Sequence, residues 1–233
     1  AIARQLPEVK SFTHINEPLT TARFSGLYGH WYPHHRDARS FLVALINQVR
    51  ATQLAMQAIR SINDKAQLVQ TENIDECHST SKLRYQANFE NHRRWLSIDL
   101  LLGKVNQTHV LWKHLEEHLD DMQAVEALND APVKIDILGW NYYLTSERFL
   151  DHRLDRYPEN THGGNGRDVY ADVEAVRVLP DGMQGFEGLL GQAWQRYGLP
   201  TAITEVHLGC HRESQVRWIL DAWKSAQNVK RSG

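Results

Sequence analysis

The chain has 233 residues, of which 42% are hydrophobic, and this is enough apolar material to bury one sizeable core. These values exclude intrinsic disorder and the small disulfide-stapled classes. The 26 basic and 28 acidic residues leave a formal net charge of −2, which provides no electrostatic footprint for nucleic acid or for an anionic membrane.

The cysteine content and the first residues indicate in which cellular compartment the protein is located. Cys77 and Cys210 are the only cysteines, and they lie far apart without the spacing of a disulfide framework or a thiolate metal site. No apolar run reaches the length of a membrane span, and the first residues show no signal-peptide pattern. We therefore expect a cytoplasmic protein. Because Ala1 is followed almost at once by a strand-like segment, we expect residues 1–233 to be a single domain and a piece of a longer chain.

Strand and helix patterns alternate along the first half. Residues 11–15 are expected to form a strand, and apolar residues spaced by three and four predict a helix over residues 37–62. The next strand is expected at residues 67–71. Two further helical patterns follow within residues 91–129, and the second has one apolar face formed by Val110, Leu111, Leu115, Leu119, Met122, Val125 and Leu128.

The alternation continues to the end of the chain. Residues 133–140 are rich in β-formers, residues 186–197 predict a helix, residues 201–205 predict a strand, and a final helix is marked by Val216, Ile219, Leu220 and Trp223. Trp194 and Trp223 are expected in the core. Only residues 151–185 lack periodicity, and within them we expect a mobile, turn-rich loop at residues 160–166. This rhythm is typical of a parallel α/β fold.

Two of the predicted strands lead into a carboxylate. Glu17 follows the first strand, and Glu205 ends the strand at residues 201–205. Functional groups of parallel α/β proteins collect at the carboxyl ends of strands, so these two side chains are candidates to meet. Two carboxylates about 5–5.5 Å apart are what retaining glycoside hydrolysis requires. The alternative for Glu17, which precedes Pro18, is a solvated loop residue.

Three motifs identify a family resemblance. Residues 11–18, Ser-Phe-Thr-His-Ile-Asn-Glu-Pro, resemble the Thr-x-Asn-Glu-Pro acid/base motif of glycoside hydrolase family 1, the β-glucosidase family. Residues 137–143, Ile-Leu-Gly-Trp-Asn-Tyr-Tyr, resemble its Phe-x-Gly-x-Asn-Tyr-Tyr strand, and residues 202–205, Ala-Ile-Thr-Glu, resemble its nucleophile segment. The resemblance implies a (β/α)8 TIM barrel, of which this chain holds only the fourth to seventh βα units.

The resemblance also implies a retaining β-glycosidase acting on a small carbohydrate, without a cofactor. Glu205 would be the nucleophile and Glu17 the acid/base, while Asn16 would bind the sugar 2-hydroxyl. Tyr143 would donate a hydrogen bond to the nucleophile carboxylate. Asn141 would lie near the aglycone or, equally, support the end of its strand.

Two further segments leave alternatives open. In the stretch from Gly29 to Asp37, Trp31 or Tyr32 offers a sugar-stacking face, although packing against the barrel rim is the alternative. The histidines of that stretch lack the spacing of a metal motif, so we expect no metal. Cys77 and His78 resemble a nucleophile pair only superficially, and we expect them to be structural.

One departure suggests a second function. The family continues its nucleophile motif as Glu-Asn-Gly, whereas Val206 and His207 follow Glu205 here. Residues 203–213 and Trp218 resemble a glycosidase-like domain fused to a dTDP-4-dehydrorhamnose reductase-type protein. The alternative to an enzyme is therefore a non-catalytic sugar-binding or scaffold domain of a nucleotide-sugar protein. If the chain holds only part of a barrel, two strand edges lack neighbours, and we expect chains to associate through these edges.

Overall fold

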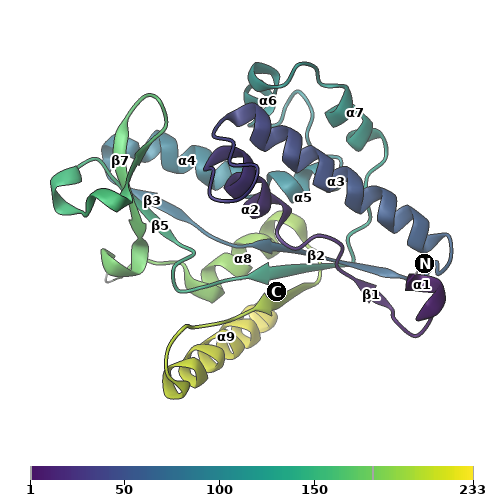
Figure 1. Cartoon of the computed structure of the whole chain (residues 1–233). Helices are drawn as coiled ribbons and strands as arrows, with labels where there is room; N and C mark the ends of the chain where they lie inside the picture. The colour runs from purple at the N-terminus through teal and green to yellow at the C-terminus, as the bar shows by residue number, and fades with distance from the viewer. Residues whose placement is uncertain (1, 180, 233) are drawn as a thin grey trace. The chain divides into compact units, whose positions relative to one another are not determined.

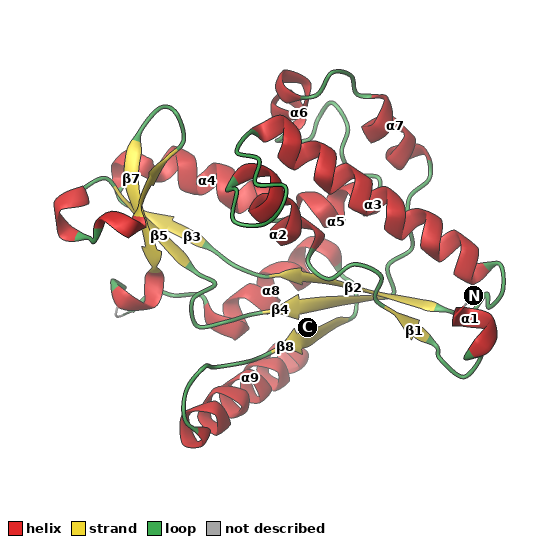
Figure 2. Cartoon of the chain, viewed as in Figure 1, coloured by secondary structure: helices red, strands yellow, loops and turns green. Residues whose placement is uncertain are grey.

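The computed structural model describes residues 2–179 and 181–232, and Figure 1 labels their principal helices and strands. In chain order the elements are α1 (Ile2–Gln5), β1 (Ser11–Phe12), α2 (Pro18–Ala22), α3 (Ala38–Arg60), β2 (Gln67–Asn73), β3 (Cys77–Ser79), α4 (Arg84–Arg93), α5 (Leu96–Leu101), α6 (Trp112–His118), α7 (Gln123–Asp130), β4 (Ile137–Asn141), β5 (Arg148–Asp151), β6 (His162–Gly164), β7 (Val169–Glu174), α8 (Gly185–Tyr197), β8 (Thr201–Glu205) and α9 (Arg212–Ser232). Strands and helices alternate through much of the chain, as Figure 2 shows by colour.

The chain divides into two compact units. The first consists of Ala1–Asn73, Trp95–Gly139 and Leu199–Ala202, and the second of Ile74–Arg94, Trp140–Gly198 and Ile203–Gly233. Strands β4 and β8 begin in the first unit and end in the second. The single-domain organisation of residues 1–233 stays a prediction.

The main sheet has the strand order β1-β2-β4-β8, so its strands lie side by side in the order in which they occur along the chain. Strands β1 and β2 are parallel. In the first unit, the Asp136 N–H donates to the Leu68 carbonyl over 3.1 Å and the Leu138 N–H to the Pro200 carbonyl over 2.8 Å. This order is what successive βα units of a barrel produce.

Helix α3 confirms the clearest helical pattern. Asp37 caps its first turn by accepting the Ser40 N–H over 2.7 Å, which satisfies one of the helix's unpaired donors. The buried face consists of Phe41, Leu42, Leu45, Ile46, Val49 and Met56. The helix ends at Arg60, so the prediction that Ile62 belongs to it is wrong, and Ile62 is exposed.

Two of the expected elements are shorter than predicted. Strand β1 covers only Ser11–Phe12, and the chain beyond it is loop up to Glu17. The helical face predicted from Val110 to Leu128 is divided between α6 and α7, because Leu119 has extended backbone angles, φ −100° and ψ 148°. Val110 precedes α6 and is exposed.

The second unit contains a small sheet that the sequence did not indicate. Its strand order is β3-β5-β7-β6, and β7 pairs antiparallel with both β5 and β6. The expectation of a loop over residues 160–166 is therefore wrong for β6. A tight turn joins β6 to β7, where the Asn165 side chain accepts the N–H groups of Arg167 and Asp168 over 3.0 and 2.9 Å.

Helices α8 and α9 pack against each other in the second unit. Gly198, with φ 61°, ends α8 in the left-handed conformation that favours glycine, as its position predicts. Trp194 and Trp223 are 39% and 65% exposed, so placing them in the core is wrong. Val216, Ile219 and Leu220 of α9 are also exposed. None of the helices in the described residues combines the length and apolar character needed to cross a bilayer.

Candidate active site

The segment that carries Glu17 lies along β2 in the first unit. Beyond β1, the Thr13 hydroxyl donates to the Val69 carbonyl over 2.9 Å. The Thr71 hydroxyl then donates to the Asn16 side-chain oxygen over 3.0 Å, and the Glu17 N–H donates to the Thr71 carbonyl over 3.2 Å. These bonds hold the two predicted site residues at the carboxyl end of a buried strand.

Glu17 has a strained backbone. Its φ and ψ are 46° and 62°, in the left-handed region that residues other than glycine rarely adopt. Pro18 follows as the first residue of α2, where its fixed φ suits a helix. Such strained residues persist only where the surroundings fix them, and they cluster at functional sites.

Glu72 on β2 is a second carboxyl group in this region, and we had not predicted a role for it. It is fully buried, and its Oε1 accepts the Leu19 N–H in the first turn of α2 over 3.0 Å. Burial is the main cause that raises the pKa of Glu72 to about 8, and the negative charge of Glu17 adds to the rise, whereas Ser97, the Leu19 N–H and the charge of Arg23 oppose it. Within the described residues, the Ser97 hydroxyl has no hydrogen-bond partner. Glu72 is therefore mostly neutral near pH 7.

The aromatic side chain of Trp31 is half exposed. Its ring meets Phe24 edge to face, with centroids 5.1 Å apart and planes at 79°, and the Trp31 backbone N–H donates to the Phe24 carbonyl over 3.0 Å. Packing therefore holds one side of the indole while a substantial part remains accessible. Both the packing role and the sugar-stacking role predicted for Trp31 are compatible with this arrangement.

The ends of β4 and β8 are joined in the second unit. The Tyr142 N–H donates to the Glu205 carbonyl over 3.1 Å, and the Thr204 hydroxyl donates to the Asn141 side-chain oxygen over 2.6 Å. Asn141 is completely buried. This geometry favours support of the strand end over contact with an aglycone, and a substrate-binding role for Asn141 stays a prediction.

Tyr143 and Glu205 are in direct contact. The Tyr143 hydroxyl donates a hydrogen bond to Oε2 of Glu205. The Tyr143 backbone N–H donates to the Ser146 hydroxyl over 3.0 Å, and the Ser146 N–H returns to the Tyr143 carbonyl over 2.9 Å. The turn thus holds the tyrosine while its hydroxyl orients the carboxylate.

Glu147 is held in place by several hydrogen bonds, and no sequence pattern indicates this role. It is fully buried and accepts the N–H groups of Gln184 and Gly185 over 3.0 and 2.8 Å, as well as the Tyr142 hydroxyl over 2.9 Å. Burial tends to raise the pKa of Glu147, but the bonds from His78, the two backbone N–H groups and Tyr142 lower it overall. Glu147 acts as a side-chain cap for the start of α8.

Cys77 and His78 do not have the features of a nucleophile pair. The His78 ring lies 2.7 Å from Oε2 of Glu147. Burial raises the pKa of the Cys77 thiol well above its usual range, with further increases from nearby carboxylates. Because the thiolate is the reactive form, this environment disfavours nucleophilic chemistry at Cys77.

Comparison with solved structures identifies the fold. The chain is 17% identical to the family 1 β-glucosidase from Thermotoga maritima, with a TM-score of 0.75, and the match covers 100% of this chain and 53% of that one. Against structures of a β-glucosidase from the same organism with cyclophellitol and with noeuromycin, the identity is 19% in each case, and the TM-scores are 0.75 and 0.76. Neither family models nor curated proteins gave a match.

These similarities confirm the predicted resemblance at the level of fold. The chain has the α/β fold of the family 1 β-glucosidases, with a parallel sheet that forms part of a TIM barrel. It spans about half the length of the solved structures it matches. Glu17 lies in the first compact unit and Glu205 in the second, and their action as a catalytic pair stays a prediction.

Proposed function

We propose that this chain contributes the catalytic carboxylates of a retaining β-glycosidase. Glu205 is the proposed nucleophile and Glu17 the proposed acid/base. The observation that carries the proposal is the hydrogen bond from the Tyr143 hydroxyl to the Glu205 carboxylate, because a nucleophilic carboxylate must be ionised and fixed in orientation. The glycosidase-like fold supports it.

The proposed reaction has two steps. In the first, a Glu205 carboxylate oxygen attacks the anomeric carbon, the glycosidic C–O bond breaks, and Glu17 gives its proton to the leaving oxygen. In the second, Glu17 takes a proton from water while the water oxygen attacks the anomeric carbon, which releases the sugar and restores the Glu205 carboxylate. This chemistry requires the two carboxyl groups to be about 5–5.5 Å apart when substrate is bound.

The remaining residues have binding roles in the proposal. Asn16 binds the sugar 2-hydroxyl through its amide, and Trp31 supplies an apolar face for the sugar ring. Asn141 supports the end of the strand that leads to Tyr143. No cofactor is needed for these steps. A cytoplasmic location belongs to the same proposal and rests on the free thiols of Cys77 and Cys210.

The test is nucleophile replacement with chemical rescue in the full-length protein. Glu205→Gly should abolish hydrolysis of an aryl β-glycoside, and azide should restore part of it, because the small anion can attack in place of the lost carboxylate. Glu213→Gly removes an exposed carboxylate of α9 and should leave both activity and azide response unchanged. Undiminished activity of Glu205→Gly would refute the assignment.

A second candidate function rests on the residues after the strand. Val206 and His207 replace the family's Asn-Gly, and this bulkier turn favours a sugar-binding or scaffold domain of a nucleotide-sugar protein. A fluorosugar that traps the glycosyl-enzyme distinguishes the two. Stoichiometric labelling of Glu205, located by mass spectrometry, would exclude the binding domain, whereas sugar binding without labelling would support it.

A further inference from the structure

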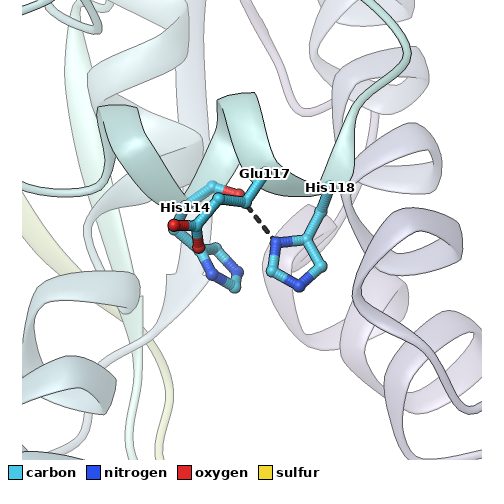
Figure 3. A group of neighbouring side chains, drawn as sticks. All are labelled: His114, Glu117 and His118. Atoms are coloured by element: carbon cyan, nitrogen blue, oxygen red, sulfur yellow. Dashed lines mark hydrogen bonds between the residues drawn. The ribbon is translucent and has the colours of Figure 1, made fainter.

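Helix α6 carries three metal-ligating side chains on one side of its last turn and a half. His114, Glu117 and His118 each offer one ligand atom, and these atoms lie within 4.8 Å of one another. Figure 3 shows the two imidazole rings side by side, with the Glu117 carboxylate next to the His114 ring. The rings are 4.4 Å apart between centroids. This arrangement follows from the helix itself, since residues three and four apart share a face.

The tautomer of His118 is suited to binding a metal. Its Nδ1 lies 2.9 Å from the His114 backbone carbonyl, as the dashed line in Figure 3 shows. A carbonyl only accepts, so Nδ1 carries the proton in the neutral ring and Nε2 holds a lone pair. Metal-binding histidines commonly donate their second ring N–H to a backbone carbonyl, which orients the ring and raises its basicity. The helix backbone therefore supplies the hydrogen bond that orients His118 as a metal ligand.

The Glu117 carboxylate can exchange its present partner for a metal ion with little loss of folding stability. Its ion pair with Lys113 is 3.8 Å long, and both side chains are largely exposed. Exposed pairs of this kind contribute little to stability. His114 and His118 are half-buried, so the two nitrogens are better fixed than an ordinary surface pair.

We propose that His114, Glu117 and His118 bind a divalent transition metal of the zinc type. Two imidazole nitrogens and one carboxylate oxygen suit Zn²⁺, and the Irving–Williams order extends the expectation to Ni²⁺ and Cu²⁺. Mg²⁺ and Ca²⁺ prefer all-oxygen sites and are not expected to bind. The expectation of no metal rested on the spacing of the two cysteines and on the histidines from Gly29 to Asp37, and helix α6 contains none of these residues.

The metal would stabilise a helix that is short of local support. Helix α6 has seven residues, and its N-terminal flanking residue, Leu111, provides no side-chain cap. Helices of this length are marginal on their own. A metal joining His114 to His118 would cross-link the final turn directly before the chain becomes extended at Leu119. The site is independent of the proposed glycosidase chemistry, and its test needs no activity measurement.

Calorimetric titration of the untagged chain with Zn²⁺ tests the proposal. We expect one equivalent to bind, and His114→Ala or His118→Ala to weaken the affinity by about tenfold or more. Glu117→Gln should weaken it less. The matched controls are Glu116→Gln on the same helix and His211→Ala, which replaces a largely exposed histidine just before α9, and both should bind as the parent does. Unchanged affinity in the His114→Ala, His118→Ala double variant would overturn the proposal.

A second measurement uses the unaltered protein and does not depend on variant folding. Diethyl pyrocarbonate modifies accessible imidazoles, and mass spectrometry locates the modified residues. Zn²⁺ should protect His114 and His118 but not His211, and Mg²⁺ should protect none of them. Equal modification of His114 and His118 with and without Zn²⁺ would contradict the site.

Discussion

Glu72→Gln provides a sharp test of the electrostatics around Glu17. The parent side chain is fully buried and accepts the Leu19 N–H over 3.0 Å. Glutamine has nearly the same shape and keeps an oxygen for that hydrogen bond, but it does not ionise. The substitution therefore removes the titration while retaining the contact with α2.

The expected effect follows from the difference in pKa. The pKa of Glu72 is about 8 in the folded chain against an ordinary value of 4.5. Because the folded-state pKa is raised, the folded chain binds more protons than the unfolded chain within this window, and parent stability falls as the pH rises from 4.5 to 8. Relative to fully protonated Glu72, the free energy of unfolding falls by about 1 kcal/mol at pH 5 and by about 3 kcal/mol at pH 7.

Urea unfolding at pH 5, 6, 7 and 8 measures this slope. The buried amide that the substitution introduces costs about 1–2 kcal/mol at every pH, so the change in the stability difference with pH is the readout. That difference should shift by about 2–3 kcal/mol in favour of the variant from pH 5 to pH 7. A difference that stays constant over this range would show that Glu72 is ionised in the folded chain and refute our reasoning.

Asp136→Asn is the control with the opposite sign. Burial tends to raise the pKa of Asp136, but hydrogen bonds from Lys134 and the Leu68 N–H and the charge of Arg60 lower it overall. The ionised form therefore stabilises the fold above its unfolded-state pKa, and this contribution is lost as the pH falls. The variant should be less stable than the parent at pH 7, and the difference should narrow in acid.

Three other predictions concern the second unit and the edges of the main sheet. Tyr143→Phe removes the donor to Glu205 and should lower kcat by about 10–100-fold with a smaller change in KM in steady-state assays; an unchanged kcat would contradict its role. Glu147→Gln leaves buried partners poorly matched and should lower the free energy of unfolding by about 2–4 kcal/mol in urea, whereas a loss below about 0.5 kcal/mol would be evidence against the capping role. Strands β1 and β8 end the described main sheet, so residues 1–233 should associate through these edges in light scattering; a monomer at all concentrations would argue against this.

Local patterns account for the parts of the fold that sequence predicted well. Helix α3 was predictable because Asp37 caps it and its apolar residues repeat with the helical period. Gly198 and Pro200 likewise limited α8, and strand β8 has the predicted limits. The motif residues around Glu17, Tyr143 and Glu205 were found because each is a short contiguous pattern.

The parts that failed depend on contacts between distant segments. Strand β6 contains two glycines and forms only because β7 pairs with it. Glu147 caps α8 across 37 residues of sequence. Glu72 was detectable in principle, since a carboxylate near the end of a strand was the signal used for Glu17 and Glu205. The predicted strand ends at residue 71, one residue before Glu72, whereas β2 continues to Asn73.

The left-handed backbone of Glu17 destabilises the fold, whereas the proposed function requires the carboxylate of the same residue. Glycine adopts φ 46° without the steric penalty that a Cβ imposes, so Glu17→Gly should relieve about 1 kcal/mol of strain while deleting the proposed acid/base. A selection for thermostability alone would accept this substitution readily. If glutamate persists at position 17 in a selected population, its carboxylate is required. The residue found at this position therefore indicates whether the chemistry is under selection.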